Sequence, residues 1–173
     1  IGASDLTLAG TSATTGTVGG GLGSTGGTAS KGYTTFAEPK PDAVTLEAWV
    51  KTTSGSGGRI IGLGSSAGNS STSFDLALYL GNNGRVNAGV RNAAGSIVTT
   101  TSAQAVNDGQ WDQLAFTVDA SGSSIVIDGR RSGRNQNGTG GAPLTGYWRV
   151  LADNTSGLGN RPTDTALSGS VDE

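Results

Sequence analysis

The sequence predicts an all-β fold, a sandwich or barrel of short strands, on three observations. Short runs alternate apolar and polar residues, which is the period of a strand that buries one face. Clusters of Gly, Asn, Asp and Ser divide these runs at intervals of roughly 8–12 residues, as in sandwiches and barrels. No segment sustains the 3.6-residue period of a helix. Glycine supplies 31 of 173 residues and proline only 4, which favours a turn-rich domain over a proline-rich linker.

The clearest strand is expected at 44–50, where Val44, Leu46 and Ala48 alternate with polar residues. A hairpin turn is expected at 82–84, because Asn and Gly accept a positive φ. The same reasoning gives the remaining strands, which are expected at residues 59–63, 74–80, 85–90, 96–101, 111–118, 124–128, 146–151 and 167–171.

Three stretches are expected to be irregular. Residues 10–32 are largely Gly, Thr and Ser and offer only Val18 and Leu22 for burial. Residues 131–145 and 153–166 are long and polar. Loops of this length are often functional in compact domains, so they are the first place to look for a site.

The residue inventory excludes several kinds of chemistry. The chain has no Cys, no His and no Met. It therefore has no disulfide framework, no thiolate nucleophile and no imidazole base or metal ligand. A metal site would have to use oxygen ligands, which favours Ca²⁺.

Charge and hydropathy exclude two classes of partner. The net charge is −2, and the densest positive spot is Arg130, Arg131 and Arg134, too little for a nucleic-acid footprint. No apolar run approaches the ~20 residues of a membrane span. Because the chain begins at Ile1 rather than Met, we expect a mature chain or part of a longer one.

The acidic residues disfavour catalysis. A glycoside hydrolase needs two carboxyl groups about 5–9.5 Å apart. The chain has only Glu38, Glu47 and Glu173, and none has an acidic partner two residues away on the same strand face. We interpret Glu47 as a structural carboxylate and expect a protein that is not an enzyme.

Four motifs follow one another along the second part of the chain: TLEAWVKT at 45–52, NDGQWDQLAFT at 107–117, IVIDG at 125–129 and LSGSVDE at 167–173. Together they resemble the laminin-G-like domain family, in its bacterial form. The resemblance implies a concanavalin A-like jelly-roll β-sandwich of two curved antiparallel sheets, as a single domain over residues 1–173. In that family, Trp49 and Trp111 match core or near-core positions.

The two ends depart from the family pattern. Members usually open with a further strand before the region of Asp5, and they usually continue after the Val-Asp-Glu motif with another apolar strand. We therefore expect that the domain lacks its first and last strands. Either the sequence is an excerpt of a longer chain or another segment fills the gap, since exposed strand edges seek partners.

The resemblance also implies calcium. Many members bind Ca²⁺ through loop carboxylates and carbonyls, and Asp172 matches the family pattern best. Asp153 and Asp5 are weaker candidates. The alternative is that these side chains cap turns through hydrogen bonds to the backbone.

A carbohydrate site is the other candidate, because sugars bind to aromatic platforms beside polar groups. For Trp148 the alternative is that its ring packs in the core. The aromatic candidates are Tyr147 and Trp148, and the polar ones are Asp153, Asn154, Asn160 and Arg161.

These observations lead to two hypotheses about function. The first is a non-catalytic extracellular recognition module, secreted or on the cell surface, that binds carbohydrate or another cell-surface ligand with assistance from calcium. The alternative is a structural subunit or spacer domain of a surface appendage or adhesin, whose sheet is completed by a strand from a neighbouring chain or segment. Neither hypothesis involves nucleic acid or membrane insertion.

Overall fold

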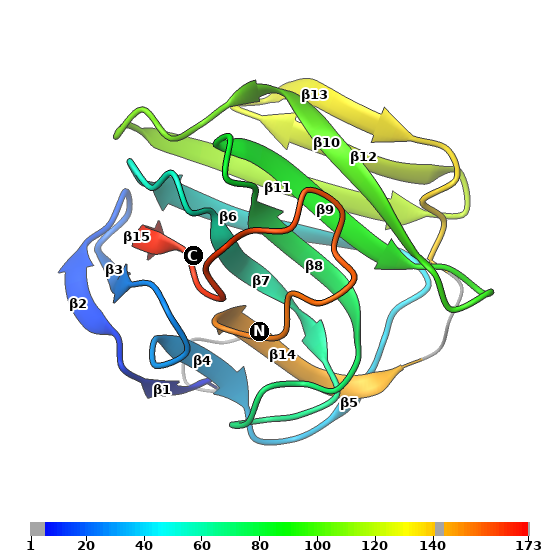
Figure 1. Cartoon of the computed structure of the whole chain (residues 1–173), viewed down its shortest axis with the longest axis horizontal. Coiled ribbons are helices and arrows are strands. Elements are labelled where there is room, and N and C mark those ends of the chain that lie inside the picture. The colour runs from blue at the N-terminus through cyan, green and yellow to red at the C-terminus, as the bar shows by residue number, and fades with distance from the viewer. Residues whose placement is uncertain (1–5, 141–143, 173) are drawn as a thin grey trace.

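Two antiparallel sheets pack face to face in this protein (Figure 1). The structure, a computed structural model, describes residues 6–140 and 144–172, and in them the chain forms fifteen strands and no helix. The all-β sandwich predicted from the alternating pattern is thereby confirmed.

The first sheet has eight strands, and one of them, the short β5, pairs only with β14. In spatial order its strands are β1 (Leu6–Ala9), β4 (Lys31–Thr34), β14 (Thr145–Leu151), β7 (Gly58–Gly64), β8 (Phe74–Leu80), β9 (Arg85–Arg91) and β10 (Ile97–Ala105), with β5 at Glu38–Pro39.

The second sheet has seven strands. In spatial order they are β13 (Arg130–Asn135), β12 (Gly122–Ile127), β11 (Trp111–Asp119), β6 (Val44–Lys51), β15 (Ser168–Asp172), β3 (Gly20–Thr25) and β2 (Ser12–Thr15).

The two ends of the chain meet in both sheets. β4 pairs with β14 in the eight-stranded sheet, and β3 pairs with β15 in the seven-stranded sheet. Figure 1 shows these early blue strands beside the late orange and red ones. The N-terminal strands thus complete the sheets that the rest of the chain builds.

Two stretches that were expected to be irregular contain strands, so those expectations are wrong in part. Residues 10–32 supply β2, β3 and the start of β4, and residues 131–135 belong to β13. Sheet hydrogen bonds join backbone groups, so they form without apolar side chains. Glycine even helps in β3, because a Cβ at Gly21 would lie 3.0 Å from the carbonyl oxygen of Val171.

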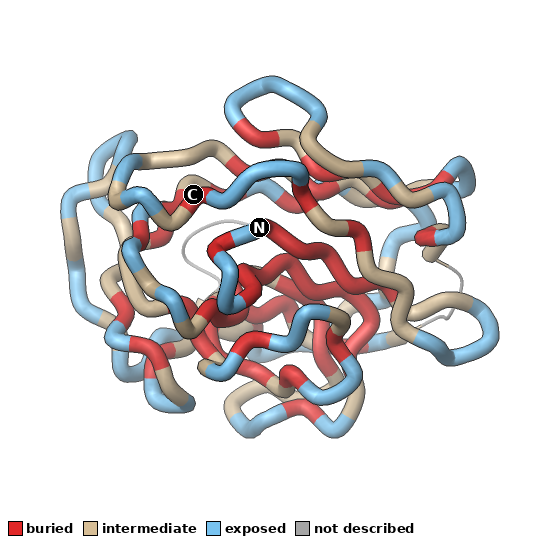
Figure 2. The backbone as a smooth tube through the Cα atoms, turned by 45° about the horizontal axis from the view of Figure 1, so that its top comes forward, coloured by how far each residue is buried: buried red, intermediate tan, exposed pale blue. Residues whose placement is uncertain are grey.

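The main core lies between the inner faces of the two sheets. Leu46, Ala48 and Val50 of β6 point into it, and their polar neighbours point out, as the alternation predicts. Figure 2 shows the buried segments inside and the exposed ones at the turns.

A second cluster lies on the outer face of the eight-stranded sheet. There Leu158 packs on Phe74, Ala77 and Tyr79 of β8. The segment 152–166 thus covers this face, and all seven residues of β8 are buried. Residues 153–165 contain no strand, as expected for this loop.

Candidate functional site

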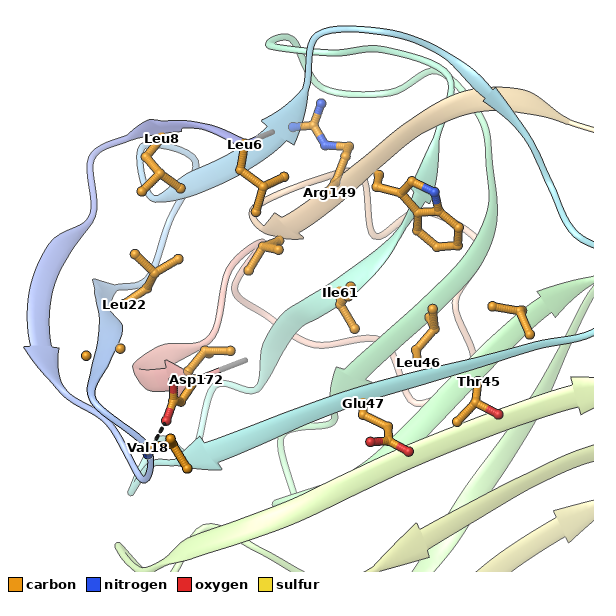
Figure 3. A pocket seen from close by; sticks show the side chains of 16 residues that line it. Leu6, Leu8, Val18, Leu22, Thr45, Leu46, Glu47, Ile61, Arg149 and Asp172 are labelled. Carbon is orange, nitrogen blue, oxygen red and sulfur yellow. Dashed lines mark hydrogen bonds between the residues drawn. The ribbon is translucent and has the colours of Figure 1, made fainter. Parts of the chain in front are cut away.

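A cavity of about 700 Å³ opens beside β6 and β3, between the two sheets (Figure 3). Aliphatic side chains make most of its wall, and the few polar groups, among them Arg149, Glu47 and Asp172, lie on different sides of it. The lining residues are Leu6, Leu8, Val18, Gly20, Gly21, Leu22, Val44, Thr45, Leu46, Glu47, Ile61, Trp148, Arg149, Val150, Val171 and Asp172.

The cavity runs along the edge of a strand and not along its face. Its wall includes the four consecutive residues 44–47 of β6. Successive side chains of a strand point to opposite faces, so a cavity on one face would meet only alternate residues. Within the described ranges, β15 pairs with β6 only at Trp49, Val50 and Lys51. Residues 44–47 therefore have β11 on one edge and the cavity on the other.

Of the residues predicted to bind a sugar, Trp148 lines this cavity. It is only 7 % exposed and belongs to the main core. Its indole N–H donates a hydrogen bond to Oε2 of Glu38 at 2.8 Å. The indole therefore packs in the core and fastens β5 to the sheet, and it presents no open platform to a sugar.

Asp153 lies at a buried charge cluster on the outer face of the eight-stranded sheet. Its Oδ2 is 3.7 Å from Nη1 of Arg59 and 3.4 Å from Nε of Arg149. Its Oδ1 accepts a hydrogen bond from the backbone N–H of Ser71 at 2.8 Å. Burial lowers the pKa of Arg59 to about 10 despite the nearby carboxylate. Asp153 therefore stabilises two buried cations.

Gly62, which has no side chain, leaves room for this cluster. A Cβ at Gly62 would lie 2.4 Å from Nη2 of Arg59, so a larger residue would displace the guanidinium. The same guanidinium lies over the ring of Phe74, 4.9 Å from its centroid. It also donates to the backbone oxygens of Asn154 and Leu76, at 2.8 and 3.3 Å.

The other predicted polar residues lie on the covering segment. The side-chain amide of Asn154 donates to the backbone oxygen of Ser71 at 2.9 Å, which holds the segment in place. Asn160 is exposed, and its amide donates to Oδ1 of Asn87 at 3.0 Å. Arg161 is also exposed. These side chains lie over the outer face of the sheet, so the structure does not bring them together with the inward-facing Trp148.

Tyr147 lies half-buried on β14, opposite Gly64 of β7. It is one position away from Trp148, so the two rings point to opposite faces of the sheet. The predicted pair of aromatic side chains therefore does not form one platform.

The candidate metal ligands do not converge. Oδ2 of Asp172 accepts the backbone N–H groups of Thr17 and Val18 at 2.7 and 3.0 Å, which caps the turn of the β2–β3 hairpin. Asp153 faces two guanidinium groups, whose charge repels a cation. Asp5 lies outside the described residues. Over residues 6–140 and 144–172, no group of three or more acidic side chains gathers around one point.

Two tryptophans share the outer face of the seven-stranded sheet, whereas the family resemblance implies core or near-core positions for both. Trp49 on β6 faces away from Ala48 and Val50, and Trp111 lies at the start of β11. Both side chains are only partly buried. The alternation of β6 predicts the outward direction of Trp49, because Ala48 and Val50 on either side of it point inward.

The register sets these rings close together. Trp49 pairs with Gln113, and Trp111 pairs with Lys51. The two indoles are therefore diagonal neighbours on adjacent strands, a spacing of about 7–8 Å between backbones that large side chains bridge. Glu47 is exposed on the same face, two residues from Trp49.

The carboxyl group of Asp112, next to Trp111 on β11, points to the opposite side of the sheet, because Asp112 pairs with the inward-facing Val50. Burial, then the negative charges of Asp128 and Asp108, raises its pKa to about 6. Its Oδ2 is buried and has no hydrogen-bond partner among the residues described. The ionised carboxylate is therefore unfavourable in the folded state at neutral pH.

Comparison with known proteins gives one family. A sequence model of the laminin-G-like type, described as the concanavalin A-like lectin/glucanases superfamily, matches residues 22–173. No curated protein matches the chain. The part of the chain that the structure describes contains no helix long and apolar enough to cross a membrane.

Solved structures share the fold at low sequence identity. The binding domain of Paraclostridial Mosquitocidal Protein 1 aligns with a TM-score of 0.67 and 10% identity, over 96% of this chain and 41% of that one. The heptameric SAP-like pentraxin from Limulus polyphemus aligns with a TM-score of 0.58 and 17% identity, over 80% of this chain and 65% of that one. This chain thus spans less than two thirds of either.

A third structure contains a sugar. Domain 4 of AbnA, an extracellular arabinanase of Geobacillus stearothermophilus, was solved in complex with arabinotriose. It aligns with a TM-score of 0.60 and 14% identity, over 96% of this chain and 80% of that one. At such identities the likeness concerns the fold alone.

Proposed function

Because the chain belongs to the laminin-G-like branch of the concanavalin A-like lectin/glucanase superfamily, we propose that it is a non-catalytic extracellular module that binds carbohydrate. The proposed binding surface is the outer face of the seven-stranded sheet around Trp49 and Trp111, which we call the tryptophan face. The partly exposed pair of indoles on that face is the observation that carries the proposal.

The tryptophan face combines the two features that sugar binding needs. The apolar faces of indole rings take up the C–H side of a sugar ring, and nearby polar groups bond its hydroxyls. Gln113 and Lys51 lie directly opposite the two tryptophans and offer an amide and an ammonium group. Glu47 adds an exposed carboxylate, an acceptor of hydroxyl hydrogen bonds.

The outer face of the other sheet is a poorer candidate. The segment 152–166 covers part of it, and Arg59, Arg149 and Asp153 are buried there. On the seven-stranded side, by contrast, Trp49 and Trp111 are both partly exposed on the outer face. The arabinotriose complex of the similar domain supports a short oligosaccharide as the first ligand to test.

The non-catalytic part of the proposal rests on how the carboxylates are used. Asp172 is bonded to two backbone N–H groups, and Asp153 is paired with arginines. Neither is placed as a general acid or base facing a sugar. Hydrolysis of the bound oligosaccharide in a long incubation would contradict this part.

Titration calorimetry with arabinotriose and a panel of short glycans tests the binding proposal. We expect a signal for at least one glycan, a blue shift of tryptophan fluorescence, and a loss of about tenfold or more in affinity for Trp49→Ala or Trp111→Ala. Tyr147→Ala serves as the control on the opposite sheet and should leave the affinity unchanged.

Two results would count against the tryptophan face. The first is binding that Tyr147→Ala, Asn160→Ala or Arg161→Ala abolishes while Trp49→Ala does not, which would favour the residues predicted from sequence. The second is no binding to any glycan by the folded protein. Calcium dependence is tested by repeating the titration with Ca²⁺ and with a chelator.

A further inference from the structure

A lysine and an aspartate form a buried pair that the proposed function does not use. Nζ of Lys40 lies 3.1 Å from Oδ2 of Asp75, and the two side chains are only 5% and 1% exposed. Asp75 belongs to β8, inside the eight-stranded sheet, and Lys40 directly follows β5. Lysine and aspartate are rarely buried this deeply unless they are paired, so each side chain is here because of the other.

The backbone around the pair is held on both sides. The N–H of Lys40 donates to the backbone oxygen of Leu144 at 2.8 Å. Two residues earlier, Glu38 accepts the indole N–H of Trp148. β8 pairs with β7 on one edge and with β9 on the other. The amine therefore meets the carboxyl group with little freedom, which is the arrangement that favours a reaction between two groups.

The amine of Lys40 lies in apolar surroundings. A Cβ at Gly140 would lie 2.9 Å from Nζ of Lys40, and 3.6 and 3.8 Å from methyl carbons of Val118 and Val90. These two valines belong to the main core. Glycine at position 140 thus leaves room for the amine beside the core, where water is scarce.

The carboxyl group of Asp75 is poorly compensated as an anion. Apart from the contact with Lys40, neither of its oxygens has a hydrogen-bond partner among the residues described. Burial raises its pKa, although Lys40 and Arg91 act in the opposite direction. Buried ion pairs normally depend on such additional hydrogen bonds, so a form of this pair without charges is favoured.

We propose that Lys40 and Asp75 are joined by an amide bond between Nζ and Cγ. Cγ is one bond away from Oδ2, so it lies within about 4.4 Å of the amine. The ammonium group gives one proton to the carboxylate, and the neutral amine then attacks Cγ. The N–C bond forms, one C–O bond breaks, and the hydroxyl group leaves as water with a second proton from the nitrogen. Atoms and charge balance without any further reactant.

The bond acts as a covalent staple in a chain that cannot form disulfides, because it has no cysteine. Lys40 lies on the connection from β5 to β6, which leads from the eight-stranded sheet to the seven-stranded sheet. The amide ties this connection to β8 and closes residues 40–75 into a loop. A closed loop restricts the unfolded chain and so stabilises the folded one. The staple is independent of the proposed function.

Mass spectrometry of the denatured protein tests the bond. Condensation removes one water, so the mass should be about 18 Da below the value calculated from the sequence. Trypsin cuts after Lys and Arg but not before Pro, so the bond between Lys40 and Pro41 resists it. The digest should contain one branched peptide in which residues 32–51 and 60–85 are joined. Fragmentation of this peptide should place the link at Lys40 and Asp75.

Three variants complete the test. Lys40→Met removes the nucleophile at similar side-chain length, and Asp75→Ala removes the carboxyl group. Each should show its full calculated mass. Lys31→Arg is the matched control at a lysine of β4 and should keep the loss of water. If a variant does not fold, the branched peptide from the parent protein decides the question by itself.

Two results would overturn the proposal. The first is a parent protein that keeps its full calculated mass, even after prolonged incubation in the folded state. The second is a loss of water that persists in Lys40→Met or maps to Asp108 or Asp128, which each precede a glycine and can close to a succinimide. In either case the pair is an ordinary buried ion pair. Neither result depends on whether the tryptophan face binds a glycan.

Discussion

At the scale of single residues, the carboxylate of Asp153 is the shared counter-charge of two buried arginines. It is fully buried and faces the guanidinium groups of Arg59 and Arg149, which are also buried. The arginines further donate to backbone oxygens, including those of Ser66 and Ala152 around Arg149. The cluster thus joins β7 and β14 to the covering segment.

Replacing this carboxylate leaves two cations without a counter-charge. We expect Asp153→Asn to lower the free energy of unfolding by about 3–5 kcal/mol, since breaking a buried ion pair exposes an uncompensated charge. Urea denaturation measures the loss. Asp42→Asn is the control on an exposed carboxylate and should change stability by less than about 0.5 kcal/mol. Equal effects at both positions would contradict the role of the cluster.

The carboxyl group of Asp112 gives a prediction about pH. Its pKa in the folded protein is raised to about 6, above the value near 3.9 of an unfolded chain. The folded state therefore binds the proton more tightly, and its stability falls as the pH rises from about 4 to about 6. The penalty persists above that range.

Asp112→Asn removes this titration. We expect the variant to be more stable than the parent at pH 7.5, by about 1 kcal/mol once solvent screening of this partly exposed group is allowed for, and equally stable near pH 3.5. Thermal melts at the two pH values measure the difference. A gain of the same size at both values would show that the change acts through packing and not through the charge.

At the scale of elements, the β2–β3 hairpin depends on a side chain from the far end of the chain. Asp172 on β15 accepts the N–H groups of Thr17 and Val18 at the hairpin turn. A Cβ at Gly16 would lie 2.4 Å from this carboxylate, so the turn needs a glycine there. The last strand thus orders one of the first turns.

Asp172→Ala should release this turn. We expect faster hydrogen exchange at Thr17 and Val18 and a loss of about 1–3 kcal/mol in stability, the usual effect of removing hydrogen bonds to a charged group. Asp164→Ala is the matched control, because Asp164 caps a different turn through the N–H of Gly27. It should leave Thr17 and Val18 unchanged. If Asp172 binds calcium instead, Ca²⁺ will slow exchange in the parent protein.

The strands that were predictable from sequence are those that bury one face. β8 was expected at 74–80 and is found at Phe74–Leu80, and β6 differs from its expected end by one residue. β2, β3 and β13 were missed, because Gly, Ser, Thr and Arg carry no hydrophobic alternation. Their pairing depends on neighbours that lie far away in the sequence.

The candidate sites were less predictable than the strands. The sequence shows which residues are aromatic or acidic, and it does not show which sheet they face. Trp148 and Asp153 were selected as ligand-binding residues, yet the structure buries both. The cavity beside β6 is lined by residues from Leu6 to Asp172, which local patterns do not bring together.

At the scale of the whole molecule, the pairing of both chain ends governs folding. β4 pairs with β14 and β3 pairs with β15, so these contacts close nearly the full length of the chain. Long loops cost entropy before their contacts form, which makes such topologies slow to fold. The N-terminal strands are expected to join last.

We therefore expect refolding in the range of milliseconds to seconds or slower. Stopped-flow tryptophan fluorescence measures the rate, because Trp49 and Trp111 lie in the seven-stranded sheet and Trp148 lies in the eight-stranded sheet. Asp172→Ala, which loosens the contact between the ends, should speed unfolding and hardly change the refolding rate. Submillisecond refolding, or a large decrease of the refolding rate in this variant, would contradict a late closure.

The charge cluster at Asp153 also constrains how this domain can evolve. Arg59 and Arg149 share the carboxylate of Asp153, and Gly62 leaves the room that Arg59 occupies. A change at one of these positions leaves a buried charge unbalanced or a cavity unfilled, so single steps away from the set are costly. Sequence drift should therefore replace these positions together, by an apolar set of similar volume, and selection from a combinatorial library at positions 59, 149 and 153 should return joint replacements and few single ones.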